Sequence, residues 1–266
     1  MNSMVFGRYL PVDSFVHRLD PRLKIGALLT LLITVFFDAG FLGYALIGLF
    51  VVVALILTKI PAKMVVQAVK PMLIMLLFLS VFNLIFLHTG KLVAKVGPLS
   101  IYSGAIFQTI YISIRLVLIV SLTTILTAST KPLDMTLGLE HLLSPLKVIK
   151  FPVHEVAMMI SIALRFIPTL VEEAQRIMKA QASRGVDFNE GTFKEKVFAI
   201  VSLIIPLFIS AFQKADDLAN AMESRNYNPE AKRTRYHQLH WCLADSFVLG
   251  LIVLLCGTII VMSIVL

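Results

Sequence analysis

Charged residues are scarce in this chain of 266 residues: Asp, Glu, Lys and Arg make up 15% of it, whereas soluble domains carry about 25%. Hydrophobic residues make up 58%, and the mean hydropathy is +0.88. They are clustered in runs with few or no charges, such as Leu42–Thr58, Pro71–Leu87 and Gly104–Thr127. This composition excludes an ordinary soluble domain and predicts an all-α polytopic membrane protein.

Residues that carry chemistry are also few. The two cysteines, Cys242 and Cys256, form neither a disulfide framework nor a metal motif. No Gly-x-x-x-x-Gly-Lys-Ser/Thr phosphate loop occurs, and His154-Glu155 lacks the second histidine of a zinc-protease helix. No cluster of Ser, Cys or His suggests nucleophilic catalysis. The sequence therefore predicts a protein that is not an enzyme and has no cofactor or metal of its own.

About five segments are long and apolar enough, or nearly so, to cross a bilayer, which takes about 20 residues. They are roughly Lys24–Gly40, Phe41–Thr58, Pro71–His88, Gly104–Ser129 and Leu243–Leu266. Charges in Met1–Lys24 argue against a signal peptide, so the first helix is expected to be retained. Asp38-Ala39-Gly40 is expected as a tight turn, and the stretch from Gly90 to Gly104 as a short β-hairpin turning at Gly97-Pro98.

The basic residues predict the orientation. Lys and Arg number 24 against 16 Asp and Glu, and 14 of the 24 lie between Lys131 and Arg235. Cytoplasmic segments of membrane proteins are enriched in Lys and Arg, which explains the net charge of +8 without a nucleic-acid partner. We therefore expect a cytoplasmic N-terminus, an external C-terminus and a cell-membrane location.

The same rule predicts three parts: residues 1–130 with the first four transmembrane helices, a cytoplasmic arm over residues 131–240, and a C-terminal transmembrane helix over residues 241–266. Val197–Phe212 is uncharged and could be a buried or interfacial helix or a span. The charge rule favours keeping it inside.

The arm contains two long helical patterns, at about Val153–Ser183 and Thr192–Arg225. Proline should kink both, at Pro168 and at Pro206. A stripe of small residues at four-residue spacing favours the close approach of another helix. The stripe consists of Ala211, Ala215 and Ala219.

Both patterns end in the same way, as Ser183-Arg184-Gly185 and as Ser224-Arg225-Asn226, 41 residues apart. Gly and Asn readily adopt the left-handed conformation that closes a helix. An Arg near one helix C-terminus is routine, because it complements the helix dipole. Two such endings in one arm favour a function: two guanidinium groups that bind carboxylates of partner proteins.

These endings resemble the paired Ala/Ser-Arg-Gly-type motifs of the T component of energy-coupling factor (ECF) transporters, a family called EcfT; Asn226 departs from the usual Gly. The N-terminal stretch is also similar to the start of that family. It comprises Gly7-Arg8-Tyr9, Asp13-Ser14, His17, Leu19-Asp20-Pro21-Arg22 and Lys24. The resemblance covers essentially the whole chain.

The resemblance implies a transmembrane coupling subunit of an ATP-driven importer. Such a subunit joins two cytoplasmic ATPases, which bind ATP and Mg, to a membrane subunit that binds a vitamin or metal ion. Arg184 would then meet one ATPase and Arg225 the other, with Ser183, Gly185, Ser224 and Asn226 shaping the tips. The coupling helices would also scaffold the substrate-binding subunit.

The alternatives are a self-contained secondary transporter, which would need internal repeats across its spans, and a membrane-embedded enzyme, for which no paired acid and base occur. Arg115 lies well inside a predicted span, where either a function or packing against a neighbouring helix could explain it. Trp241 is expected to anchor the last span at the membrane surface. Lys131–Leu143 is expected as a short helix.

Overall fold

The structure is a computed structural model that describes residues 9–37, 39–87, 89–96, 99–145, 152–188, 190–228 and 239–265. The chain forms two compact units. We call residues 1–143 with 239–266 the membrane unit, and residues 144–238 the arm unit.

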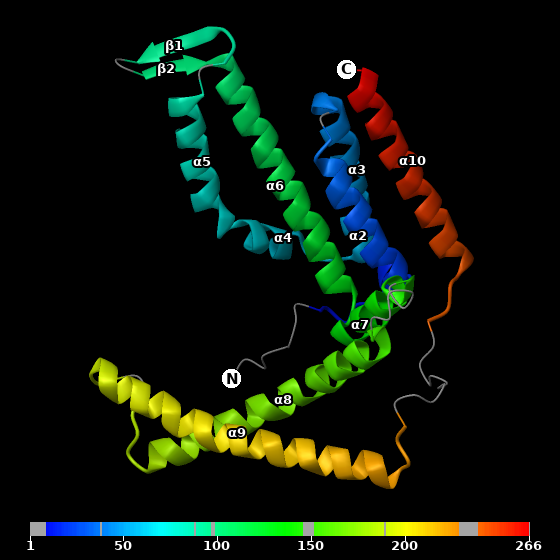
Figure 1. The fold of residues 1–266 in the computed structure, drawn as a ribbon. Coiled ribbons are helices and arrows are strands. Elements are labelled where there is room, and N and C mark those ends of the chain that lie inside the picture. The colour runs from blue at the N-terminus through cyan, green and yellow to red at the C-terminus, as the bar shows by residue number, and fades with distance from the viewer. Residues whose placement is uncertain are drawn as a thin grey trace. The chain divides into compact units, whose positions relative to one another are not determined.

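The membrane unit consists of helices and one two-stranded hairpin among the described residues (Figure 1). Its elements are α1 (Phe15–Arg18), α2 (Pro21–Val35), α3 (Gly40–Thr58), α4 (Ala62–Val69), α5 (Met72–Phe86), β1 (Leu92–Val96), β2 (Leu99–Tyr102), α6 (Ser103–Ser129), α7 (Pro132–Leu142) and α10 (Leu243–Val265). The antiparallel strands confirm the predicted hairpin, and its Gly97-Pro98 turn lies outside the described residues. The predicted all-α polytopic fold is confirmed.

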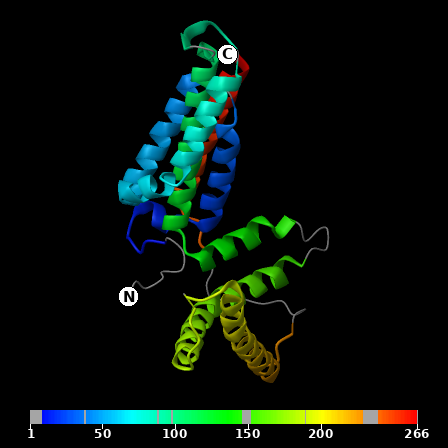
Figure 2. The same ribbon diagram turned by 90° about the vertical axis from the view of Figure 1, so that its left-hand side faces the viewer.

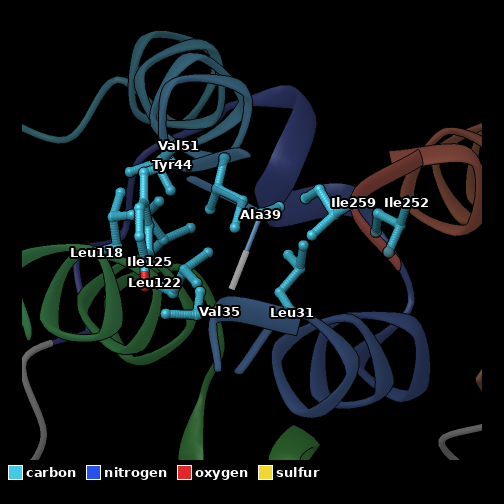
Figure 3. Packing of buried hydrophobic residues seen from close by; sticks show 11 residues of the cluster. Leu31, Val35, Ala39, Tyr44, Val51, Leu118, Leu122, Ile125, Ile252 and Ile259 are labelled. Carbon is cyan, nitrogen blue, oxygen red and sulfur yellow. The ribbon is translucent and has the colours of Figure 1, made fainter. Parts of the chain in front are cut away.

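The core of the membrane unit lies where α2, α3, α6 and α10 run alongside one another (Figures 1 and 2). Figure 3 shows its side chains, which come from all four helices. Val35 and Ile47 are essentially inaccessible, as is Ile259 on α10. Many apolar side chains elsewhere on these helices stay exposed, as expected for a surface that faces lipid.

Four helices among the described residues are long and apolar enough to cross a membrane: α3, α6, α10 and the arm-unit helix α9 (Phe193–Ser224). The pair α4 and α5, bent by 52°, would be a fifth. The expected first span, Lys24–Gly40, is wrong in length. Its helix α2 ends at Val35 and has 15 residues, about 22 Å at 1.5 Å per residue.

The third expected span, Pro71–His88, is α5, and the preceding amphipathic helix α4 was missed. The span expected at Phe41–Thr58 is α3, and those at Gly104–Ser129 and Leu243–Leu266 are α6 and α10. Asp38 and His88 lie outside the described residues. Helix α9 passes the length and hydropathy test although the charge rule places it in the cytoplasm.

The arm unit is built on α8 (Val153–Ser183) and α9, in agreement with the two helical patterns. Both remain continuous through their internal proline, Pro168 in α8 and Pro206 in α9. Thr192 and Glu195 begin α9 with a reciprocal capping box, which satisfies two otherwise free backbone N–H groups.

The two arm helices pack against each other in antiparallel fashion. Gln181 Nε2 donates to the carbonyl of Ser202 at 3.4 Å near the end of α8 and the start of α9. At the other end of the pair, the Tyr227 hydroxyl lies 3.2 Å from Met158 Sδ. The C-terminal ends of α8 and α9 therefore lie at opposite ends of the pair, as Figure 1 shows.

Candidate functional site: the two helix tips of the arm

The first tip closes α8 through a Schellman motif, a pair of backbone hydrogen bonds that ends a helix with a left-handed residue. Gly185 has φ +89°. Its N–H donates to the Ala182 carbonyl at 3.0 Å, and the Val186 N–H donates to the Gln181 carbonyl at 3.1 Å. The predicted left-handed closure at Gly185 is confirmed.

The second tip closes α9 with the same bonds. Asn226 has φ +54°. Its N–H donates to the Glu223 carbonyl at 2.9 Å, and the Tyr227 N–H donates to the Met222 carbonyl at 3.0 Å. Asn therefore replaces Gly without changing the closure, because Asn tolerates the left-handed region.

Arg184 and Arg225 occupy the same place in the two tips. Arg184 is the C-cap of α8 with φ −90° and ψ 6°, and Arg225 is the C-cap of α9 with φ −95° and ψ 17°. Both side chains are exposed, and among the described residues neither guanidinium forms an ion pair or hydrogen bond. Two such groups are available to carboxylates outside the chain.

The neighbouring serines stabilise the tips from within. Ser183 Oγ donates to the Lys179 carbonyl at 3.1 Å, and Ser224 Oγ donates to the Ala221 carbonyl at 3.0 Å. Both hydroxyls thus bond back to carbonyls three or four residues earlier in their own helix.

We infer an approximate local twofold relationship between the tips from the contacts between α8 and α9. The 41-residue interval between Arg184 and Arg225 also separates Glu173 from Lys214, whose Oε2 and Nζ atoms lie 3.8 Å apart. Residues that a twofold rotation exchanges can contact each other only near the axis. This ion pair was not predicted, although the repeated interval is visible in the sequence.

The ends of the helix pair obey the same relationship. Ala199 lies 41 positions after Met158, and Val186 lies 41 positions before Tyr227. Tyr227 contacts Met158, and Val186 and Ala199 line one hollow of about 670 Å³ beside the first tip. The arm unit therefore presents the Ser-Arg-Gly/Asn motif twice, in two related settings.

The other arm residues singled out from the sequence lie away from the tips. Along the predicted close-packing stripe, Ala211 is half-buried and Ala215 and Ala219 are exposed. Pro168 is exposed and Pro206 half-buried, each within its continuous helix.

The first half of α9 carries a broad exposed apolar surface. We call this surface the α9 apolar face; it consists of Phe193, Val197, Phe198, Ile200, Val201, Ile204, Ile205, Phe208, Ile209 and Phe212. Phe193, Phe198 and Phe208 are 83%, 73% and 61% exposed. Contiguous apolar surfaces of this kind mark contacts with lipid or with a protein partner.

In the membrane unit, Arg115 on α6 packs against a neighbouring helix. Its Nε and Nη2 atoms donate to the Tyr44 hydroxyl on α3 at 3.1 and 2.6 Å, and its guanidinium lies 5.4 Å from the centre of the Phe36 ring. Through these contacts Arg115 links α6 to α3. Trp241 is half exposed and donates to Ser246 Oγ at 2.8 Å.

The described part of the chain contains no group of three or more His, Cys, Asp or Glu side chains arranged to hold a metal ion. The two exposed guanidinium groups thus stand out as the candidate functional groups, and they are suited to recognition of carboxylates.

Known proteins resemble the chain over nearly its full length. The profile of the family described as cobalt transport protein (CbiQ) matches residues 13–236. The energy-coupling factor transporter transmembrane protein EcfT of Bacillus subtilis is 46% identical over 255 residues, 96% of each chain. The protein of the same name from Limosilactobacillus fermentum is 44% identical, and that from Lactococcus lactis 41%, both over 96% of each chain. The chain therefore belongs to the EcfT family of energy-coupling factor transporter transmembrane proteins.

Proposed function

We propose that this chain is the coupling subunit that joins two cytoplasmic ATPases to a membrane substrate-binding subunit for vitamin or metal-ion uptake. One observation carries the proposal: two exposed arginines, unpaired among the residues that the structure describes, cap two helices with the same backbone geometry, at opposite ends of one antiparallel pair. One tip serves each ATPase.

The chemistry of the tips supports docking rather than catalysis. A guanidinium binds a carboxylate through two parallel N–H···O bonds, which fix direction as well as distance. The Schellman motif holds each arginine at the end of a rigid helix, so that little ordering is needed when the partner binds. In this proposal the chain is not an enzyme, and the ATPases hold ATP and Mg.

The α9 apolar face supports a second contact, with the substrate-binding subunit. That partner lies in the membrane and offers apolar side chains. The exposed phenylalanines of α9 would pack against these apolar side chains, which favours binding through shape and removal of apolar surface from water. The substrate would be bound by that partner.

The topology that fits this function has the N-terminus in the cytoplasm and the C-terminus outside. Residues 131–240 carry the Lys and Arg excess and would lie with the ATPases in the cytoplasm.

The test is the double variant Arg184→Ala/Arg225→Ala, expressed with the ATPases and the substrate-binding subunit. We expect it to insert in the membrane but to lose ATPase co-purification and substrate uptake by at least about tenfold, because truncating one partner of a buried charge pair costs about 2–5 kcal/mol. The matched control is Arg176→Ala on α8, whose 76% exposed side chain pairs with Glu173 of its own helix at 3.6 Å. Normal uptake in the double variant would overturn the proposal.

A further inference from the structure

The chain leaves the membrane unit after α6 and α7 and returns to it just before α10. We call residues 129–143 the outgoing connection and residues 239–246 the returning connection. Both are held by the segment Asp20–Lys24, which begins α2 and belongs to the N-terminal stretch that the sequence marks out. The proposed docking function gives this segment no role.

The outgoing connection is held by Lys24, whose side chain is 8% exposed. Its Nζ donates to the Ser129 carbonyl at 3.2 Å and to the His17 carbonyl at 3.1 Å. Ser129 is the last residue of α6, where carbonyls lack helical partners and a cation complements the helix dipole. Lys24 therefore ties the end of α6 to α2.

Helix α7 continues this attachment. It packs against α2, and the approach is close at Gly138: a Cβ there would lie 3.0 Å from Ile25 Cδ1 and 3.2 Å from Pro21 Cβ. The last helix before the arm unit thus rests on the same turn of α2.

The returning connection is held by Asp245, which is 1% exposed. Its Oδ1 accepts from the Asp20 N–H at 2.9 Å, and its Oδ2 accepts from the Cys242 N–H at 2.7 Å. One carboxylate therefore binds both the entry to α10 and the start of α2, 225 positions apart in the chain.

Asp20 completes the arrangement. It is 4% exposed and caps α2, with Oδ1 accepting from the Arg22 N–H at 2.8 Å. Asp20, Asp245 and Lys24 lie within one buried region, where Asp134 on α7, Asp245 and Asp20 all act electrostatically on the Lys24 ammonium group. Arg22 Nε also lies 3.9 Å from Asp20 Oδ1. Because charged groups in one buried region depend on one another, a change at Lys24 or Asp245 is expected to affect the whole group.

We propose that the segment Asp20–Lys24 is an anchor that fixes both connections of the arm to α2, and that Lys24 and Asp245 are positioning residues that pass movement of the arm to the membrane helices. The coupling part rests on the proposed function. Movement of the arm that displaces either connection would displace the first turn of α2. Helix α2 packs against α6 and α10, so these helices would move with it. A connection that is no longer bonded to α2 would move by itself and leave the membrane helices in place.

The first experiment uses this chain alone, in lipid nanodiscs, and measures amide hydrogen exchange. The variants are Lys24→Met and Asp245→Asn. The matched control is Thr34→Val, which removes a partly buried hydrogen bond between α2 and α10, from Thr34 Oγ1 to Cys256 Sγ at 3.2 Å. If the anchor is one unit, each variant speeds exchange by about tenfold at both connections, residues 129–143 and 239–246, since hydrogen bonds to charged groups are among the stronger ones in a protein.

The anchor proposal would be overturned if exchange rose only around the mutated residue. It would also be overturned if Thr34→Val raised exchange at both connections by the same factor. Lys24→Arg keeps a cationic donor and is expected to retain protection at the returning connection. This variant keeps the test decisive if Lys24→Met yields too little folded protein.

The second experiment measures substrate uptake per ATP hydrolysed in the assembled transporter. We expect Lys24→Met and Asp245→Asn to co-purify with the ATPases but to lower this ratio at least fivefold, with Thr34→Val unchanged. An unchanged ratio in both variants would overturn the positioning role. Failure of the wild-type chain to bind ATPases would overturn the proposed function instead, while the exchange experiment still decides the anchor.

Discussion

Glu173 and Lys214 pair across the arm helices, with Oε2 of one 3.8 Å from Nζ of the other, and they are the residues that the 41-residue interval makes equivalent. This contact places the local twofold axis about two thirds of the way along both α8 and α9. It therefore defines the register of the helix pair that separates Arg184 from Arg225.

The register can be tested by crosslinking in a chain with Cys242→Ser and Cys256→Ser. We expect Glu173→Cys with Lys214→Cys to be joined by a short bismaleimide in most molecules, because the two side chains meet between the helices. Gln175→Cys with Lys214→Cys is the matched control, since Gln175 is exposed on α8. Mass spectrometry of the tryptic peptides measures the yield, and equal yields for the two pairs would contradict the antiparallel register.

The tips should tolerate exchange of their closing residues. Nothing lies within 4 Å of a Cβ built on Gly185, so Gly185→Asn and Asn226→Gly should leave uptake and tip protection nearly unchanged. Gly185→Ala should destabilise the first tip by about 1–2 kcal/mol, because Ala resists positive φ. Amide exchange of Val186 measures this effect; protection equal to the wild type in Gly185→Ala would show that the left-handed closure is not needed.

Arg115 and Tyr44 should behave as a coupled pair. Tyr44→Phe leaves a guanidinium inside the helix bundle without its hydroxyl partner and is expected to lower the free energy of unfolding by about 1–3 kcal/mol. The double variant Arg115→Met/Tyr44→Phe should be less destabilised than the sum of the single variants. Thermal unfolding in detergent measures the cycle, and additive losses would argue against direct coupling.

Gly138 should be intolerant of a side chain. Gly138→Ala forces a methyl group against Ile25 and Pro21 and is expected to cost about 1–3 kcal/mol through overpacking. The control is Gly48→Ala on α3, where a Cβ meets nothing within 4 Å, so that stability should hold or rise. If the two variants unfold at the same temperature, α7 does not depend on this close approach.

Local signals predicted much of the fold. The α8 pattern ended at Ser183 because Gly185 marks the closure, and the structure ends the helix there. The span at Gly104–Ser129 agrees with α6 to one residue. Helix α4 was missed because its eight residues are too few to separate, by pattern alone, from the apolar run that follows, although they are amphipathic.

Relationships between distant residues could not be predicted. The sequence marks Asp20 and Lys24 as part of a family-like opening, but nothing local connects them to Asp245 or to the end of α6. These contacts depend on tertiary packing that brings chain segments more than 100 positions apart into hydrogen-bonding distance. The 41-residue interval between the tips is visible in the sequence. The twofold relationship between the helices could be inferred only from the Glu173–Lys214 contact in the structure.

The local twofold axis of the arm has a consequence for stoichiometry. In the proposed function, a single polypeptide that carries the same cationic motif at both ends of one helix pair would contact both members of a pair of ATPases. Binding would then stop at one copy of this chain per ATPase pair, since both motifs would be occupied and neither would be left to bind another partner.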